Sequence, residues 1–521
     1  MLEADGAPLA RMPPRHLAAE EKQRGSLLGS LARLQPREAL TVELPLSLDP
    51  AAAAAAYANP PRDVHLSVVF ALARPTAWAE AGHEVAREQF EVPLPPPPPG
   101  ADPAPRAAAE GAAAAAGAAA VPAALRVEQS AHCFVLSGVG AGGVPFTYRV
   151  GRRAGDLALR VRGELMVEEA SGLQLWRAPT DNDRANTLAS ISRPTLDSIA
   201  QMPWYMRLFF ALPRRVRAVL DPNDHSHADL WRAAGLHAAV PRLESLELAC
   251  QTAALAELRA TYALRPPSSG RVLAVHELRM RVHADGEVQL LNEACVRVAV
   301  PSLPRVGLRF GLPARLERCR WFGLGPHENY VDRQRGAAVA VHTAAVDELF
   351  TPYLAPGECG HRGGLRWLEV RDAVGAGVRI SGAGGPPLGF SVLRYSAAQL
   401  DGATHPHELE PDARRLWLSL DHRMMGVGGD TGWTRSVHAP YRVPPGTYRW
   451  VLALRPLADE AHACAVRAAG DERAHAAARA WLEERGPAYE PRPPPRPSRA
   501  LLMLLFAVLM GFLLALYDSY P

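Results

Sequence analysis

The chain has 521 residues, of which 57 are Lys or Arg and 54 are Asp or Glu, and its formal net charge is +3. A chain of this length exceeds what one hydrophobic core can organise, so two or more domains are expected. The near balance of charges lacks the basic excess typical of nucleic-acid-binding proteins, and no nucleic-acid partner is expected.

The N-terminal part of the chain consists of three segments that differ in composition. Residues 1–34 are polar and charged, have no continuous apolar segment of the signal-peptide kind, and are expected to be disordered or loosely helical. Apolar and polar residues then alternate over 41–46 and 64–70, a pattern that predicts strands and a β-sandwich domain over 35–94. A Pro- and Ala-rich linker is expected over 95–124.

Strand patterns dominate the next part of the chain, from 125 to 457. Alternation is clear over 151–169, 272–292 and 448–454, and Asp285-Gly286 is a good hairpin turn between two alternating runs. These patterns predict one long all-β domain. Residues 187–220, with the apolar run 204–212, break the pattern as an insertion, for which membrane docking, a partner surface and an error in the gene sequence all remain open.

The C-terminal part is predicted to be helical and then to enter a membrane. An alanine-rich helix is expected over 458–486 and an Arg/Pro spacer over 487–499. Residues 500–517 form an uncharged apolar run, near the lower length limit for a transmembrane helix. Arginines precede this run and Asp518 follows it, so a single-pass C-terminal anchor with the main body in the cytosol is expected. The alternative is a buried or signal-like helix.

A glycine-rich turn at 426–433 (GVGGDTGW) separates two strand-like runs. Its glycines allow a close approach of backbone and ligand, Asp430 offers a hydrogen-bond acceptor, and Trp433 offers a flat apolar face. Sugars are bound by such a combination of carboxylate and aromatic ring. The alternative is a tight hairpin whose tryptophan packs in a core.

Several longer segments carry a resemblance to a known family. They are residues 75–90, 175–183 (LWRAPTDND), 321–330 (WFGLGPHENY), 332–333, 351–353, 366–369 and 391–396. In this order they resemble the C-terminal region, or small chain, of the family 2 glycoside hydrolase β-galactosidases (lactases), together with the preceding β-sandwich, over about 35–457. The resemblance implies a mainly β fold: an immunoglobulin-like β-sandwich, then a large antiparallel supersandwich of the galactose mutarotase type.

The same resemblance implies an accessory role for this chain. In the family, the two catalytic carboxylates of the retaining reaction lie on a TIM barrel that precedes the matched region. No segment before Thr41 is long enough for such a barrel. We therefore expect no catalytic residue, metal ligand or cofactor in this chain. Trp433 matches the family's apolar platform for substrate, with Asp430 beside it, and Asp181, Asn182 and Asp183 match the start of a mobile loop near the site.

The sequence also departs from the family pattern. The loop motif normally continues with glycine, but here Arg184 follows and the chain runs into the insertion, which puts the loop movement in doubt. Thr431-Gly432 replaces the usual Asp-Ser before the platform tryptophan, and Cys359 replaces a common asparagine.

Two other sets of residues could carry chemistry. Asp181 and Asp183 could form a glycosidase pair, but two carboxylates so close in a turn more often brace that turn. Five histidines could form a metal or acid/base cluster, and two of them, His405 and His407, would share one face of an extended strand. Scattered histidines are more often structural, so no metal site is expected. The five are His327, His361, His405, His407 and His422, and Glu328, next to His327, belongs to the same candidate cluster.

Two functions remain open on the sequence. The first is a β-galactosidase small-chain region that binds carbohydrate and completes an active site for terminal β-D-galactosides, with a barrel subunit or a homo-oligomer as partner. The second is a stand-alone, membrane-anchored carbohydrate-binding protein or pseudoenzyme. An aldose epimerase is a weaker third option, because the supersandwich fold is shared with mutarotases.

Overall fold

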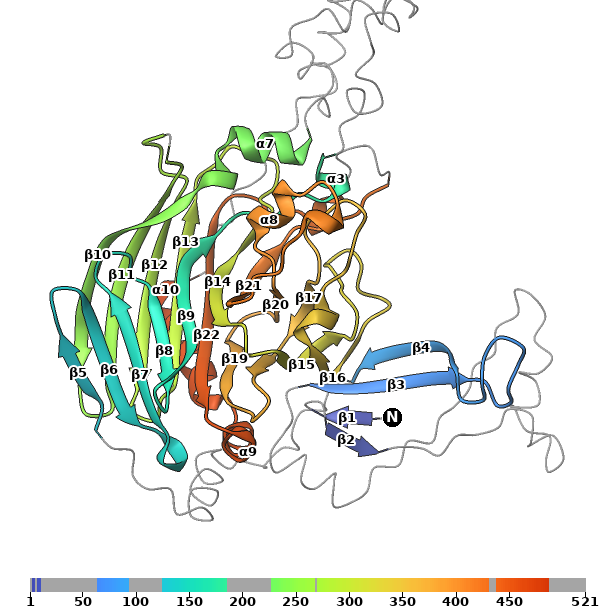
Figure 1. The fold of residues 1–521 in the computed structure, drawn as a ribbon, viewed down its shortest axis with the longest axis horizontal. Helices are drawn as coiled ribbons and strands as arrows, with labels where there is room; N and C mark the ends of the chain where they lie inside the picture. Colours follow the sequence, from blue (N-terminus) through green and yellow to red (C-terminus); the bar gives the residue numbers. More distant parts are fainter. Residues whose placement is uncertain are drawn as a thin grey trace, which may run out of the picture.

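The body of the molecule consists of two large antiparallel sheets that face each other (Figure 1). The computed structural model describes residues 2–4, 7–10, 63–92, 124–184, 226–267, 269–430 and 437–486. Each of the two sheets has nine strands, and buried side chains from both sheets form one continuous hydrophobic core. The mainly β, antiparallel fold expected from the sequence is confirmed.

The first sheet holds the strands in the order β10-β11-β12-β13-β22-β19-β18-β15-β16. Their bounds are β10 (Val240–Gln251), β11 (Leu255–Arg265), β12 (Ala274–His283), β13 (Val288–Val296), β22 (Thr447–Leu457), β19 (Gly377–Ala383), β18 (Trp367–Arg371), β15 (Arg318–Gly325) and β16 (Ala338–Ala345).

The second sheet has the order β17-β20-β21-β14-β9-β8-β7-β6-β5. Its strands are β17 (Arg362–Leu365), β20 (Leu388–Leu393), β21 (Arg415–Met424), β14 (Arg305–Pro313), β9 (Glu164–Gln174), β8 (Leu157–Val161), β7 (Pro145–Gly151), β6 (Cys133–Val139) and β5 (Arg126–Gln129).

Alternation in the sequence explains why these segments form half-buried strands. Along β12 every second side chain is buried, as the period of a strand requires. β12 and β13 pair antiparallel around the turn predicted at Asp285-Gly286, where Gly286 has a φ of +94° that favours glycine. The predicted hairpin is therefore confirmed.

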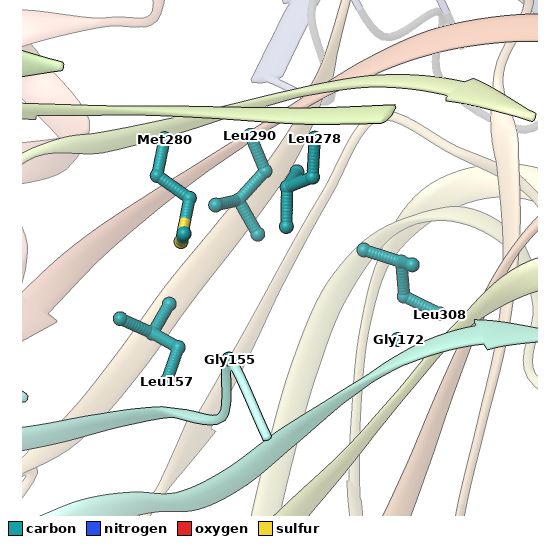
Figure 2. Close-up of a pocket in the computed structure, with 7 residues that line it drawn as sticks. All are labelled: Gly155, Leu157, Gly172, Leu278, Met280, Leu290 and Leu308. Carbon is teal, nitrogen blue, oxygen red and sulfur yellow. The ribbon is translucent and has the colours of Figure 1, made fainter. Parts of the chain in front are cut away.

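A small apolar cavity, drawn in Figure 2, lies in the core, and leucine and methionine side chains reach into it from both sheets. The lining residues are Gly155, Leu157, Gly172, Leu278, Met280, Leu290 and Leu308. Because no polar side chain lines it, this cavity has no chemistry to offer a sugar.

Elsewhere in the core, two histidines stack on one tryptophan. The ring of His276 lies 6.2 Å from that of Trp450, and the ring of His422 lies 5.3 Å from it, both nearly parallel. His276 also shares a hydrogen bond of 3.1 Å with Asn292. Burial lowers the pKa of His276 to about 4 and the pKa of His422 to about 3. Both imidazoles are therefore neutral in the folded protein at pH 7.

Helices lie at the ends of the sandwich and against the first sheet. The α-helices are α3 (Asp181–Arg184), α7 (His227–Ala233), α8 (Ala397–Gly402), α9 (Glu460–Ala469) and α10 (Glu472–Arg485), and the 3-10 helices are η3 (Ala141–Gly143), η4 (Leu236–Ala238), η5 (Val346–Leu349), η6 (Pro406–Glu408) and η7 (Ala439–Tyr441). The single helix expected over 458–486 is instead α9 and α10, which are separated at Gly470 with its φ of +65°. Trp481 of α10 packs on Leu291 and Val451 of the first sheet.

A separate four-stranded sheet precedes the sandwich body. It has the order β2-β1-β3-β4, with β1 (Leu2–Ala4), β2 (Ala7–Ala10), β3 (Val64–Ala71) and β4 (Glu84–Glu91). Strands β1 and β2 lie in the region where disorder was expected, so that expectation is wrong for these residues. The described residues of the predicted β-sandwich form this one sheet, and the predicted strand over 41–46, the linker and the insertion over 187–220 lie outside the described residues.

Hydrogen bonds from Gln89 and an ion pair of Asp63 connect this sheet to the body. The side-chain amide of Gln89 donates to the carbonyl of Val339 (2.9 Å) and accepts from its N–H (2.7 Å), so it pairs with edge strand β16 much as a neighbouring strand would. Arg366 makes a two-pronged ion pair with Asp63, at 3.0 and 2.7 Å.

The predicted membrane anchor needs correction. In the part of the chain that the structure describes, no helix combines the length and the apolar character needed to cross a bilayer. This finding overturns the predicted localisation as a single-pass membrane protein with a cytosolic body, and with it the membrane as a partner. The apolar run at 500–517, on which that prediction rested, lies outside the described residues.

Candidate functional site

The glycine-rich turn follows directly after β21, at the end of the sandwich where α3, α7 and α8 lie (Figure 1). Ion pairs connect these helices: Asp401 of α8 lies 2.6 Å from Arg232 of α7 and 3.7 Å from Arg184 of α3. The turn is described as far as Asp430, whereas residues 431–436, including Trp433, lie outside the described residues.

A buried arginine joins the segment before α3 to the turn. The guanidinium of Arg177 donates to both carboxylate oxygens of Asp183, at 3.0 and 2.7 Å, and both side chains are fully buried. Its other N–H groups donate to the carbonyls of Met425 (2.6 Å) and Gly426 (3.0 Å). One side chain therefore satisfies two carbonyls of the turn and the carboxylate of the predicted loop motif.

Two further side chains hold the turn from other segments. Asn182 donates from Nδ2 to the carbonyl of Val427 (2.6 Å). Asp332 accepts from the N–H groups of Val427 (3.1 Å) and Gly428 (2.8 Å). A Cβ atom on Gly426 would collide with the Asp332 carboxylate, so the close approach requires glycine there. We call Arg177, Asn182 and Asp332, with the backbone of 425–428, the turn clamp.

The hydrogen bonds of the turn clamp limit the chemical roles open to Asp181 and Asp183. Asp183 accepts from the Thr180 N–H as well (3.0 Å), so its carboxylate is fully engaged and cannot serve as one of a catalytic pair with the exposed Asp181. The Asp-x-Asp segment braces a turn, as such spacings usually do. The chain beyond Arg184 is outside the described residues as far as 225, and the loop's mobility stays a prediction.

Asp430 stands at the open side of the turn. It is largely exposed, and its Oδ1 lies 2.8 Å from Nε2 of His438. An exposed carboxylate with one imidazole partner keeps acceptor capacity for a ligand hydroxyl. Its assignment as a substrate-binding residue, like that of Trp433, stays a prediction.

A second layer of buried charges lies behind the clamp. Arg305 makes a two-pronged ion pair with Asp421, at 2.9 and 2.7 Å, and lies 3.4 Å from Glu358. Burial raises the pKa of Glu358 and lowers that of His361, whose ring stacks on Tyr330. All of these side chains are buried.

Glu328 is another carboxylate that the sequence placed in a candidate cluster. Burial acts to raise its pKa, but hydrogen bonds from Tyr353, from the N–H of Gly360 and from Arg333 outweigh burial and hold the pKa below its usual range. Glu328 is therefore an ionised structural acceptor rather than a proton donor.

The five histidines do not form one cluster. His361 and His422 are buried, and His327 is exposed. Of the five, the structure brings together His405 and His407, whose ring centroids lie 5.4 Å apart. They lie at η6 rather than on the extended strand considered from the sequence.

Sequence reasoning assigned no role to Arg177 or Asp332, although both lie in the quoted motifs. The signal that could have found them is the turn itself, because a glycine-rich segment that leaves a sheet must satisfy its N–H and C=O groups with side chains. Arginine is so frequent in this chain that the presence of an arginine at position 177 did not indicate a special role.

Two family models and the curated relatives indicate one family. Residues 142–454, more than half of the chain, match the family described as β-galactosidase small chain, and residues 3–93 match β-galactosidase domain 4. A β-galactosidase of Priestia megaterium is 28% identical over 407 residues, covering 75% of this chain and 31% of that protein. One from Vibrio vulnificus is 29% identical over 435 residues, covering 82% of this chain and 35% of that protein.

The chain thus spans about a third of the length of these relatives. A β-galactosidase of Vibrio cholerae is 41% identical over a shorter stretch of 177 residues, which is 34% of this chain and 16% of that protein. Among solved structures, the galactose 1-epimerase of Lactobacillus acidophilus is similar with 9% identity and a TM-score of 0.32, over 64% of this chain and 99% of that chain.

Proposed function

Because the chain belongs to the β-galactosidase small-chain family, we propose that it completes the sugar site of a β-galactosidase. In this proposal the turn clamp fixes the backbone from which Asp430 and Trp433 reach a terminal β-D-galactoside. Asp430 accepts a hydroxyl, and the indole of Trp433 covers the C–H face of the sugar. The two catalytic carboxylates come from a barrel outside this sequence, either in the same polypeptide or in a partner subunit.

The observation that carries the proposal is the turn clamp. Arg177 and Asn182 from one segment, and Asp332 from another that is distant in sequence, converge on five backbone groups of one turn. Binding sites need rigid support from such surrounding hydrogen bonds, whereas an ordinary surface turn does not. The engaged state of Asp183 and Glu328 supports an accessory rather than a catalytic role, since neither is available for proton transfer or nucleophilic attack.

Replacing Trp433 by alanine should weaken galactoside binding several-fold. An aromatic–sugar contact is worth on the order of 1 kcal/mol beyond area burial, about a fivefold change in affinity. The measurement is a titration of the chain with a β-galactoside, followed by saturation-transfer NMR, for wild type and Trp433→Ala at matched thermal stability.

Trp78→Ala is the matched control, because Trp78 is a largely exposed tryptophan that precedes β4 in the separate sheet. It should bind like the wild type. Equal affinities of the wild type and Trp433→Ala would remove Trp433 from the site. A large loss of thermal stability in Trp433→Ala would assign the tryptophan to a core.

A further inference from the structure

The turn after α8 gathers three side chains with metal-binding chemistry. His405, His407 and Glu408 are all exposed, and one potential ligand atom from each lies within 4.8 Å of the other two. No step of the proposed sugar binding uses these residues. Two imidazoles and a carboxylate are ligands that Zn²⁺ accepts in its open, three-ligand sites, where water takes the fourth position.

We propose that His405, His407 and Glu408 form a surface site for a divalent transition-metal ion, with Zn²⁺ as the ion that the ligand set fits best. The set contains no thiolate that would favour Cu(I) and too few oxygen atoms for Ca²⁺ or Mg²⁺. The three residues lie within a four-residue stretch of the chain, so binding requires no approach of distant segments.

The local backbone prepares the three side chains. Pro406 stands between the two histidines as the first residue of η6 and fixes its own φ. The two imidazole rings lie nearly parallel, with an interplanar angle of 20°. Both therefore face the same side of the turn, and their nitrogens can turn toward one point by rotation about the side-chain bonds.

Glu408 is held in place as an ionised ligand. Its Oε2 accepts from the N–H of Thr404 (2.8 Å), and its Oε1 lies 3.0 Å from Nδ1 of His405. These two contacts hold the carboxylate beside the imidazole of His405.

The potential ligand atoms, which lie within 4.8 Å of one another, must move slightly closer together to bind one ion. Ligand atoms around a tetrahedral Zn²⁺ lie roughly 3.4 Å apart, given metal–ligand bonds of about 2.1 Å. Exposed side chains close the remaining gap at little cost, because no packed neighbour must move. The ion would replace the shared hydrogen bond between His405 and Glu408.

The test is isothermal titration of the full chain, prepared without a histidine tag, with Zn²⁺ alone. Wild type should bind one equivalent more tightly than any others. His405→Ala, His407→Ala and Glu408→Gln should each weaken that equivalent by at least about tenfold, since even the loss of an outer partner costs 10- to 100-fold.

His132→Ala is the control, because His132 is an exposed histidine outside the turn. It should leave the strong equivalent unchanged. The proposal is wrong if the wild type has no such equivalent, or if the double variant His405→Ala/His407→Ala binds Zn²⁺ as tightly as the wild type. All substituted side chains are exposed, so the variants should fold like the wild type. The titration requires neither a galactoside nor a barrel subunit.

Discussion

Replacing Arg177 by methionine should lower the free energy of unfolding by about 3–5 kcal/mol, the usual cost of removing one partner of a buried ion pair. The change leaves the Asp183 carboxylate buried without its counter-charge and leaves the carbonyls of Met425 and Gly426 without their donor. The measurement is urea unfolding of the wild type and Arg177→Met, with the slope against denaturant checked for two-state behaviour.

Arg149→Met provides the matched control. Arg149 pairs with Asp156 at 3.2 Å, but its side chain is half exposed. An exposed pair contributes at most about 1 kcal/mol. The double variant Arg177→Met/Asp183→Asn should be less destabilised than the two single changes predict together, because removing both charges leaves neither one unpaired. If Arg177→Met costs no more than Arg149→Met, the turn clamp does not hold the turn.

Acidification from pH 7.5 to 5 should lower the free energy of unfolding by about 4 kcal/mol through two buried histidines. The folded-state pKa of His276 is about 4 and that of His422 about 3, both below the ordinary value of 6.5. The unfolded chain therefore binds more protons than the folded chain at pH 5. The stabilisation is fully present above about pH 6.5 and is lost as the pH falls toward the folded-state values, about 2 kcal/mol per histidine at pH 5.

The variant His422→Phe isolates one half of this effect. Phenylalanine keeps a ring beside Trp450, and the Nδ1 atom that is lost has no hydrogen-bond partner in the described part of the chain. The loss between pH 7.5 and 5 should shrink by about 2 kcal/mol in His422→Phe and stay unchanged in His132→Ala. An identical pH dependence in the wild type and His422→Phe would show that His422 is not the titrating group.

The strands were the most predictable part of the fold. Alternation over 272–292 is a local property of the sequence, and it predicted β12, β13 and the turn between them with Gly286. The helical region was harder, because the alanine content of 458–486 favours helix throughout, and the break at Gly470 depends on how α9 and α10 each pack against the first sheet.

The site was predictable in its motifs but not in its contacts. Asp183 and the glycine turn were recognised by their residue types, whereas their joint dependence on Arg177 is a contact between residues almost 250 positions apart. His405 and His407 were weighed as neighbours on a strand, yet Pro406 places them on a 3-10 turn, where Glu408 joins them. The alternation of apolar and polar residues does not indicate which side chains from different segments will come into contact.

The most direct test of the account is hydrolysis of a chromogenic β-galactoside by the purified chain. The chain should unfold cooperatively, bind galactoside through Trp433, and show no turnover above the buffer rate, because the proposed function takes its catalytic carboxylates from a barrel outside this sequence. Turnover that survives Trp433→Ala but disappears when Asp181 or Asp430 is changed to asparagine would contradict the account, because it would place the catalytic carboxylates within this chain.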